Sequence, residues 1–393
     1  MKCRIIKPAD SGVVQAPPSK SAAHRMLIAA GLSGIDIENF CKDVSQDMDA
    51  TRDCIKGILS DAKVKQVSCG ESGSTLRFML PIAGALGANT QFRAAGRLPN
   101  RPLGALREAL ESHGCTMSKE GNNPICISGQ LKSGEYTLPG DISSQYVTGL
   151  LMALPLVKKD SHITIVGKLQ SKPYVDLTMD TLTKAGIKIV EKPYGYMVPG
   201  GQKYNLPVKY VESIEGDWSN GAFWLVMKAI RSMGIECEGL DLASAQGDKA
   251  IVDIISGASQ KGELIVDASD IPDLIPVVSV LASARRKGLI TRVINGERLR
   301  YKESDRLEAV ARVMNGLGAD IEELEDGLII KGVEKLKGGE ADGCNDHRIV
   351  MMAATAACIS ENPITIDGYE AVAKSYPNFF DEYQKLGGEI EWL

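Results

Sequence analysis

The chain has 393 residues, of which 44% are hydrophobic and 24% charged, with a formal net charge of −5. The length suits two domains, and no uncharged hydrophobic run reaches the 18 or more residues that a membrane-spanning helix needs. The small negative charge gives no general attraction for nucleic acid, so any anionic ligand has to be bound by a local cluster of basic residues.

The cysteines and histidines argue against disulfides and metal. The nine cysteines are an odd number without CxxC pairs, which favours reduced thiols in the cytoplasm over a disulfide framework or a zinc site. None of the four histidines has metal-ligand spacing with another. The charged start, residues 1–7, is not typical of a signal peptide. We therefore expect a cytoplasmic protein without a metal.

In chain order, six polar clusters each run into a hydrophobic, alanine-rich stretch with helical spacing. Each cluster holds the Ser, Asp or Asn typical of a helix N-cap, and each stretch is too hydrophobic to face water. Counted from Ser21 through residues 74, 144, 219, 273 and 346, the gaps are 53, 70, 75, 54 and 73 residues, which suggests one unit repeated six times. Because helix N-termini attract anions, converging starts would build a phosphate site.

A second helix follows in several units and ends in a recurrent way. The helices expected over 106–113, 175–185, 307–317 and 379–386 each stop at a glycine, and strands are expected over 115–117, 187–189, 319–321 and 389–391. In the first unit the second helix is expected over 47–59. The repeated unit is therefore strand–helix–strand–helix–strand–strand.

The repeats divide three and three. A break near 212–216 precedes the fourth hydrophobic helix, and Pro17-Pro18 would mark a crossing between lobes. We predict an α/β protein of two lobes with three βαβαββ-type units each. Domain I comprises residues 1–14 plus 215–393, domain II comprises residues 15–214, and the helix N-termini face a cleft between the domains.

Polar groups at the expected helix starts of the first half suit anion binding. Lys20 and Ser21 stand at a helix entrance with Arg25 one turn inside, a combination that fits a phosphate or carboxylate, although a solvated helix start is the alternative. The Gly/Ser turn of residues 70–77 allows close approach of a ligand but lacks the Walker and Rossmann patterns. Capping explains one serine of the Ser-Ser-Gln group at 143–145, but hardly the whole group.

The second half adds acids. Asp273 precedes a hydrophobic helix, a setting that can raise the pKa of a carboxyl and equip it as a base, whereas a helix cap is the alternative for Asp270. The mixed charges of 302–306 alone are typical of solvated surface. His347 and Arg348, at the mouth of a wholly hydrophobic helix, are costly to bury without an anionic partner, unless both side chains reach water.

Taken together and in order, these segments resemble the 5-enolpyruvylshikimate-3-phosphate synthase family, the 3-phosphoshikimate 1-carboxyvinyltransferases. The resemblance runs from residue 17 to residue 377. Its motifs are Pro18-Ser19-Lys20-Ser21 with Arg25, the turn 70–77, Asn100-Arg101-Pro102, Ser143-Ser144-Gln145, Ser171-Lys172-Pro173-Tyr174, Ile271-Pro272-Asp273, residues 302–306, residues 345–348 and Lys374.

The resemblance implies the two-lobed, inverted α/β barrel-like enolpyruvyl transferase fold. It implies transfer of the enolpyruvyl group of phosphoenolpyruvate to the 5-hydroxyl of shikimate 3-phosphate, through a tetrahedral intermediate and with release of phosphate. This step belongs to the shikimate pathway, which leads to chorismate and the aromatic amino acids, and glyphosate targets the family. No cofactor, metal, nucleic acid or membrane partner is implied, and a monomer is the default.

The resemblance also implies residue roles. Shikimate 3-phosphate would be held by Ser21, Arg25, Ser143, Ser144, Gln145 and Ser171, with Tyr174 beneath its ring. Phosphoenolpyruvate would be held by Lys20, Gly73, Arg101, Arg306, Arg348 and Lys374. Asp273 would accept the 5-hydroxyl proton, Lys302 would lie between Asp273 and the ring, and Glu303 and Lys20 are candidates for moving the proton at the methylene carbon.

Two positions depart from the family pattern, and three other functions compete. Glu71 stands where the family usually carries Asn and would point away or pair with Arg101, and Arg298 also replaces an Asn. UDP-N-acetylglucosamine enolpyruvyl transferase shares the architecture, but its catalytic cysteine lies in a flexible loop, whereas Cys115 lies in a helix–Gly–strand connection. RNA 3′-terminal phosphate cyclase would need a catalytic His and nucleotide binding, and a non-catalytic phosphosugar-binding protein would not need both Asp273 and Glu303.

Overall fold

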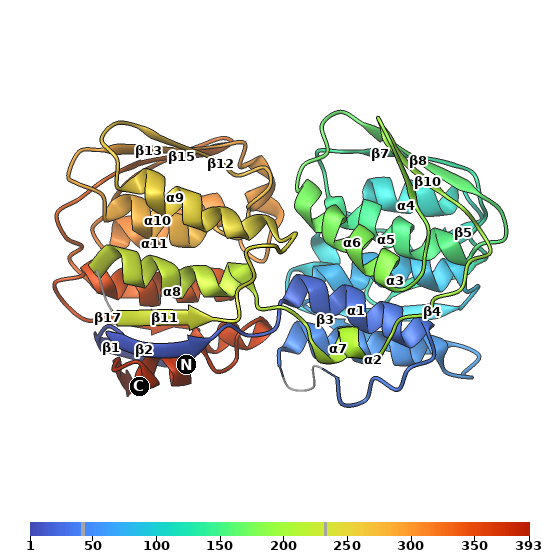
Figure 1. The fold of residues 1–393 in the computed structure, drawn as a ribbon, viewed down its shortest axis with the longest axis horizontal. Helices are drawn as coiled ribbons and strands as arrows, with labels where there is room; N and C mark the ends of the chain where they lie inside the picture. The colour runs from blue at the N-terminus through green and yellow to red at the C-terminus, as the bar shows by residue number, and fades with distance from the viewer. Residues whose placement is uncertain (41–43, 232–233) are drawn as a thin grey trace. The chain divides into compact units, whose positions relative to one another are not determined.

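The computed structural model describes residues 1–40, 44–231 and 234–393. The chain forms two compact units (Figure 1). Unit 1 comprises Met1–Pro17 and Glu215–Leu393, and unit 2 comprises Pro18–Ile214. The first division thus comes three residues later than the boundary expected after residue 14, between the two prolines. Within the described ranges, no helix is long and hydrophobic enough to cross a membrane.

Unit 2 contains two four-stranded sheets with the same strand order. In each, the first two strands run parallel and the other neighbours antiparallel. The first sheet has the order β3 (Lys65–Gly70), β4 (Thr90–Ala94), β6 (Ile125–Gly129), β5 (Cys115–Met117), and the second has the order β7 (Glu135–Pro139), β8 (Ser161–Val166), β10 (Gly195–Val198), β9 (Val190–Lys192). The helices are α1 (Lys20–Leu32), α2 (Gln46–Leu59), α3 (Gly73–Ala85), α4 (Gly104–Glu111), α5 (Ser144–Ala153), α6 (Lys172–Lys184) and α7 (Lys209–Glu212).

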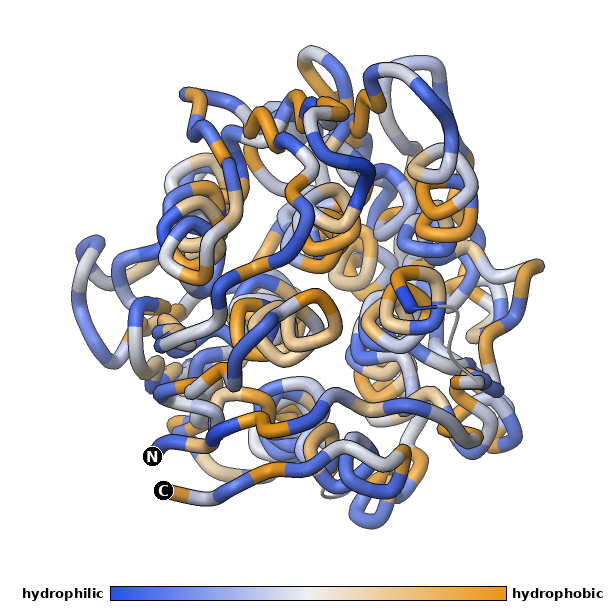
Figure 2. The backbone as a smooth tube through the Cα atoms, turned by 90° about the vertical axis from the view of Figure 1, so that its left-hand side faces the viewer, coloured by the Kyte–Doolittle hydropathy of each residue, from blue (hydrophilic) through white to orange (hydrophobic). Residues whose placement is uncertain are grey.

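Unit 1 repeats this sheet twice and adds a parallel pair. The sheets have the orders β12 (Leu264–Asp267), β13 (Ile290–Ile294), β15 (Gly327–Lys331), β14 (Asp320–Leu324) and β16 (Gly339–Asp342), β17 (Ile364–Asp367), β1 (Lys2–Lys7), β18 (Glu389–Trp392), and β2 (Ser11–Gln15) pairs with β11 (Gly234–Glu238). The helices are α8 (Trp218–Arg231), α9 (Ile251–Ala258), α10 (Ile275–Ser283), α11 (Arg306–Gly316), α12 (His347–Ala356) and α13 (Phe379–Lys385). The two ends of the chain lie side by side because β1 pairs with β18 (Figures 1 and 2).

Four of the six repeats are complete. Each complete repeat has the order strand–helix–strand–helix–strand–strand, and in the last one the N-terminal strand β1 takes the place of the final strand. The repeat around α8 keeps two parallel strands, β2 and β11. The repeat around α1 and α2 has no strand in its described residues, 18–40 and 44–64. The expectation of three full units in each lobe is therefore wrong for these two repeats.

Five of the six hydrophobic helices begin at a side-chain cap within the predicted polar cluster, although only Asp346 is the residue from which the spacing was counted. The N-cap side chains Ser19, Ser72, Ser143 and Asp346 each accept a backbone N–H, and Asp217 accepts from the N–H of Asn220 at 2.8 Å. The prediction is wrong for α10, whose N-cap is Leu274 without a side-chain bond. The predicted strand over 187–189 is also displaced, because β9 begins only at Val190.

The hydrophobic helices form the core of each unit. All ten residues of α12 and all nine of α10 are buried, and these two helices pack against each other and against α8. In Figure 2 the coils of the helices show many hydrophobic positions, whereas connecting segments are largely hydrophilic. Because these helices have no polar face, their polar side chains are concentrated in the cap and the first turn. Most of the candidate functional residues therefore lie at the helix N-termini.

Candidate functional site

In unit 1, the starts of three helices meet at the guanidinium of Arg306. Its Nε and Nη2 donate to the two carboxylate oxygens of Asp346 at 2.9 and 3.3 Å, Nη1 donates to Asp273 at 2.7 Å, and Nη2 donates to Glu303 at 2.9 Å. The Arg306 side chain is only 1% exposed. Such a buried cation requires paired carboxylates, and three carboxylates supply them. Arg306 thus holds the two predicted acids, Asp273 and Glu303, on one group.

Asp273 lies among cations. Besides the Arg306 contact, its carboxylate lies 3.5 Å from the Nζ of Lys302 and 3.6 Å from Nη2 of Arg348. Neighbouring positive charge favours the ionised form of a carboxyl, the opposite of what burial beside a hydrophobic helix alone would do. The expectation from sequence considered only the burial of Asp273 and left out these neighbouring cations, whose charge acts in the opposite direction to burial.

Burial lowers the pKa of Lys302 to about 8, although the charge of Asp273 acts in the opposite direction. The charges of Arg306 and Arg298 contribute to this lowering, and the charge of Glu303 opposes it. Lys302 is therefore an ammonium group that loses its proton within the ordinary range of working pH.

His347 and Arg348 are both buried, so the alternative that they reach water is wrong. Arg348 has the anionic partner that burial required in the Asp273 carboxylate, 3.6 Å from its Nη2, and Nδ1 of His347 lies 3.8 Å from the Asp346 carboxylate. Nη1 of Arg348 also donates to the side chain of Asn220 at 3.1 Å. The adjacent predicted ligand, Lys374, donates from Nζ to the carbonyl oxygen of Asn345 at 2.6 Å.

A further buried acid, Asp248, lies in the same region of unit 1. Its carboxylate accepts a hydrogen bond from the Ser219 hydroxyl at the start of α8. Burial and, to a smaller extent, the charges of Asp273 and Asp217 raise its pKa to about 7, while the Ser219 hydrogen bond and the charge of Arg348 oppose this shift. Asp248 thus shares the electrostatic surroundings of the predicted base.

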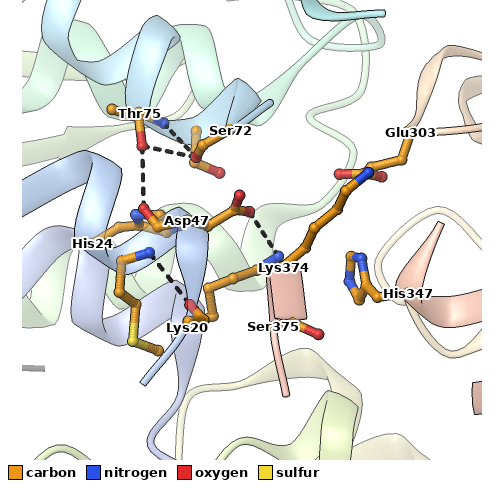
Figure 3. Close-up of polar contacts among 12 residues, drawn as sticks. Lys20, His24, Asp47, Ser72, Thr75, Glu303, His347, Lys374 and Ser375 are labelled. Atoms are coloured by element: carbon orange, nitrogen blue, oxygen red, sulfur yellow. Dashed lines mark hydrogen bonds and ion pairs between the residues drawn. The ribbon is translucent and has the colours of Figure 1, made fainter. Parts of the chain in front are cut away.

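In unit 2, a buried network joins the starts of α1, α2 and α3. Lys20 donates from Nζ to the carboxylate of Asp47 at 3.0 Å (Figure 3). The hydroxyl of Thr51 lies 2.6 Å from Nδ1 of His24 and 2.6 Å from the hydroxyl of Thr75, which in turn bonds to the Ser72 cap at 2.7 Å. Burial and the charges of Lys20 and Arg25 lower the pKa of His24, so this histidine is neutral. The network fixes the place of the Lys20 ammonium.

Gly73, the first residue of α3, is packed against two arginines. A Cβ at this position would lie 2.7 Å from Nη1 of Arg101 and 2.9 Å from Nη1 of Arg77. Arg77 also donates to Oε1 of Gln145 at 2.7 Å, and Nε2 of Gln145 donates to Ser74 at 2.9 Å. Two guanidinium groups and a helix N-terminus therefore surround one small residue, an arrangement suited to an anion.

The remaining predicted residues lie at the starts of α1, α5 and α6. Ser143 caps α5, Ser144 is its buried first residue, and Ser171 precedes α6 with a positive φ of 57°. The buried guanidinium of Arg25 makes four hydrogen bonds, to the carbonyl oxygens of Ser21 and Tyr174 at 2.5 and 2.7 Å and to the hydroxyls of Thr178 and Thr148 at 2.8 and 3.4 Å. Arg25 thus joins two predicted ligands, Ser21 and Tyr174.

The structure also shows the surroundings of Glu71 and Arg298, the two residues that depart from the expected motifs. The Glu71 carboxylate lies against Gly96, where an added Cβ would meet it. Arg298 lies in the 3-10 turn Glu297–Tyr301, close enough to Lys302 to lower its pKa. Among the described residues, no three His, Cys, Asp or Glu side chains are grouped so that they could hold a metal ion.

Reasoning from the sequence missed several supporting residues. Asp47 looks like any acid in a first helical turn, and Asn220 lies inside a cluster that was recognised only as a helix start. Arg77 lies in the turn 70–77, which was recognised as a ligand-binding motif, but Arg77 itself was given no role. Asp248, in the Gln-Gly-Asp group at 246–248, carries no signal beyond a polar run between predicted elements. Their partners come from distant segments, which only the fold brings together.

Comparison with known proteins connects this geometry to a reaction. The profile of the family "EPSP synthase (3-phosphoshikimate 1-carboxyvinyltransferase)" matches residues 6–383. The 3-phosphoshikimate 1-carboxyvinyltransferase of Clostridium kluyveri is 42% identical, with 100% of this chain and 99% of that protein covered, and the Clostridium perfringens protein of the same name is 42% identical, with both covered completely. The solved EPSP synthase of Acinetobacter baumannii has the same fold, with a TM-score of 0.77, 21% identity and full coverage of both chains.

The family expected from the motifs is thus confirmed, and so is the enolpyruvyl transferase fold. The profile covers nearly the whole chain, and the relatives align from end to end. This chain belongs to the EPSP synthase (3-phosphoshikimate 1-carboxyvinyltransferase) family.

Proposed function

We propose that the chain transfers the enolpyruvyl group of phosphoenolpyruvate to the 5-hydroxyl of shikimate 3-phosphate and releases inorganic phosphate. The observation that carries the proposal is the fixing of two acids, Asp273 and Glu303, on the single buried cation Arg306, with Lys302 and Arg348 next to Asp273. A protein that only bound phosphosugars would have no use for two acids among its anion-binding cations.

Phosphoenolpyruvate brings a phosphate and a carboxylate, and the proposal assigns cations of both units to it. Lys20 and Arg101 would serve from unit 2, with the N-terminus of α3 at Gly73 supplying backbone N–H groups. Arg348 and Lys374 would serve from unit 1. Arg306 is already bound by three carboxylates, so its proposed role is chiefly to hold Asp273 and Glu303, and a bond to substrate would compete with them.

Shikimate 3-phosphate is assigned to the starts of α1, α5 and α6. The hydroxyls of Ser143, Ser144 and Ser171 and the amide of Gln145 suit a phosphate and ring hydroxyls. The hydrogen bonds of Arg25 to the carbonyl oxygens of Ser21 and Tyr174 would keep these two residues in place.

The chemistry needs two proton transfers in each half of the reaction. In the addition step, Asp273 takes the proton of the 5-hydroxyl as its oxygen attacks C2 of phosphoenolpyruvate, and Glu303 or Lys20 gives a proton to C3. In the elimination step, C3 returns its proton to the group that gave it as the bond from C2 to the phosphate oxygen breaks, and the leaving phosphate takes the proton held by Asp273. Substrate anions would draw positive charge from Asp273, which makes its carboxylate a stronger base than in the empty protein.

The proposal includes a monomer acting on these two small molecules alone. Each unit carries its own hydrophobic core, and the net charge of −5 gives no general attraction for nucleic acid.

A coupled assay of phosphate release tests the function. Phosphate should appear only when both substrates are present, and Asp273→Asn should reduce kcat by at least about 100-fold, as loss of a general base does. Asp253→Asn, which changes an exposed carboxylate of α9, is the control and should leave kcat unchanged. Turnover with UDP-N-acetylglucosamine in place of shikimate 3-phosphate, or full activity of Asp273→Asn, would reject the assignment.

A further inference from the structure

Asn220 is a fully buried amide in the first turn of α8, with 0% of its surface exposed. Its backbone N–H donates to the Asp217 carboxylate at 2.8 Å, which sets the position of the residue at the start of the helix. A buried amide side chain has to satisfy its own donors and acceptors within the protein. The partners of Asn220 therefore indicate what it holds.

The side chain of Asn220 joins two segments that carry proposed phosphoenolpyruvate ligands. Its Oδ1 accepts from Nη1 of Arg348 at 3.1 Å and from the Ser375 hydroxyl at 3.4 Å, and its Nδ2 donates to the Ser375 carbonyl oxygen at 3.4 Å. Because a guanidinium group only donates hydrogen bonds, the atom that faces Arg348 has to be the amide oxygen. Ser375 directly follows Lys374.

The two arginines of this region differ in how far their charge is neutralised. Arg306 is bound by three carboxylates, whereas in the part of the chain that the structure describes Arg348 donates from Nη1 to a neutral acceptor, Asn220, and pairs with one carboxylate, Asp273, at the longer distance of 3.6 Å. The charge of Asp248 also acts on Arg348, but Asp248 has a raised pKa and is therefore partly neutral near pH 7. Nε of Arg348 has no hydrogen-bond partner among the described residues. Arg348 thus keeps more of its charge available for an anion.

We infer that Asn220 is a positioning residue for phosphoenolpyruvate: its amide holds Nη1 of Arg348, so that the guanidinium contacts Asp273 only through Nη2 at 3.6 Å, and it fixes the segment that carries Lys374. This inference rests on the proposed function. Without the amide, Nη1 of Arg348 would also turn toward the Asp273 carboxylate, and the closer, two-point ion pair would have to break before Arg348 could bind substrate. The amide oxygen of Asn220 can hold Arg348 without neutralising its positive charge, whereas a carboxylate at the same position would neutralise it.

Asn220→Ala and the milder Asn220→Ser test the inference by steady-state kinetics. We expect kcat/KM for phosphoenolpyruvate to fall roughly 10- to 100-fold, which is what loss of a hydrogen bond to a charged group amounts to, while KM for shikimate 3-phosphate stays within about twofold. Thr355→Val removes a buried hydroxyl of α12 whose hydrogen bond, as far as the structure describes the chain, stays within its own helix, to the Met351 carbonyl oxygen, and is the control without an effect on either substrate. Thermal unfolding shows whether each variant folds.

A double-mutant cycle shows whether Asn220 acts through Arg348. In an Arg348→Ala background, Asn220→Ala should change kcat/KM for phosphoenolpyruvate by less than about twofold, because its target is gone. An equal loss in both backgrounds, or an equal rise in KM for both substrates, would overturn the inference. Failure of the wild-type chain to release phosphate would instead reject the proposed function, so the two failures are distinct.

Discussion

Arg306 and Asp346 form a two-point pair, with Nε 2.9 Å from Oδ2 and Nη2 3.3 Å from Oδ1. Asp346 also caps α12 and accepts a hydrogen bond from the Ser304 hydroxyl at 2.9 Å. Its side chain is 0% exposed, so all of these partners are supplied by the protein. One carboxylate thus joins the start of α12 to the cation that holds Asp273 and Glu303. The acids of the site therefore depend on a residue that has no proposed contact with substrate.

Asp346→Ala is expected to destabilise the protein by about 3 kcal/mol or more, because it leaves part of a buried cation unpaired. The control is Asp305→Ala, which removes the cap of α11 and a partly exposed ion pair with Arg300, and should cost only about 1 kcal/mol. Urea unfolding of both variants measures the difference. Equal losses of unfolding free energy would show that the Arg306 pair adds nothing beyond a helix cap.

Gly73→Ala should raise KM for phosphoenolpyruvate roughly tenfold, with little change in KM for shikimate 3-phosphate. The new methyl group would meet Arg101 and Arg77 at less than 3 Å, and forcing extra volume into such a site costs about 1–3 kcal/mol. Gly104→Ala is the matched control, since nothing lies within 4 Å of its added Cβ. If the two variants behaved alike, the Arg101 guanidinium would not be a ligand of this substrate.

We expect kcat/KM for shikimate 3-phosphate to fall as the pH is raised above 8. Lysine is charged below its pKa, and the pKa of Lys302 is about 8, so the ammonium is lost as the pH rises through this value. Above pH 8 the charged fraction of Lys302, and with it kcat/KM, should fall about tenfold for each further pH unit. Lys302→Arg keeps its charge at all these pH values, so its profile should stay flat from pH 7 to 9. A wild-type profile that is flat over the same range would remove Lys302 from the binding site.

Asp248→Asn should stabilise the protein more at pH 8 than at pH 5. The folded Asp248 has a pKa of about 7 against 3.8 in model compounds, so between these values the folded state holds a proton that the unfolded state lacks. The free energy of unfolding therefore falls as pH rises through this window, by roughly 1.4 kcal/mol per unit for one proton, and the asparagine variant escapes this loss. Denaturant unfolding at both pH values measures it, with Asp253→Asn as the exposed control, and a difference that did not change with pH would contradict the prediction.

The repeats and helix starts could be predicted from sequence because they depend on local patterns, namely a cap followed by a helix without a polar face. The pattern failed at α10, where Asp273 has the right type and place for a cap. Its carboxylate binds Arg306 instead, and the N-cap of α10 is Leu274, which makes no side-chain bond. A long-range ion pair thus overrode a local preference.

The pairing of the site residues could not be predicted in the same way. The motifs indicated which cations and acids belong together, but not that Arg306 would bind three carboxylates or that Arg348 would bind an amide 128 residues away. These partners are decided by how α8, α11 and α12 pack. The neutral supports, Asn220 and Thr51, left no sequence signal because buried amides and hydroxyls look like ordinary helix residues.

The strand order of unit 1 has a consequence for synthesis on the ribosome. β1 lies between β17 and β18, whose residues follow it by more than 350 positions, and the whole of unit 2 is translated in between. During synthesis β1 therefore remains unpaired until β17 and β18 have been translated. Unit 2 is complete well before that point and has all the residues that it needs to fold. Truncating the first seven residues would therefore damage the half of the protein that is made last.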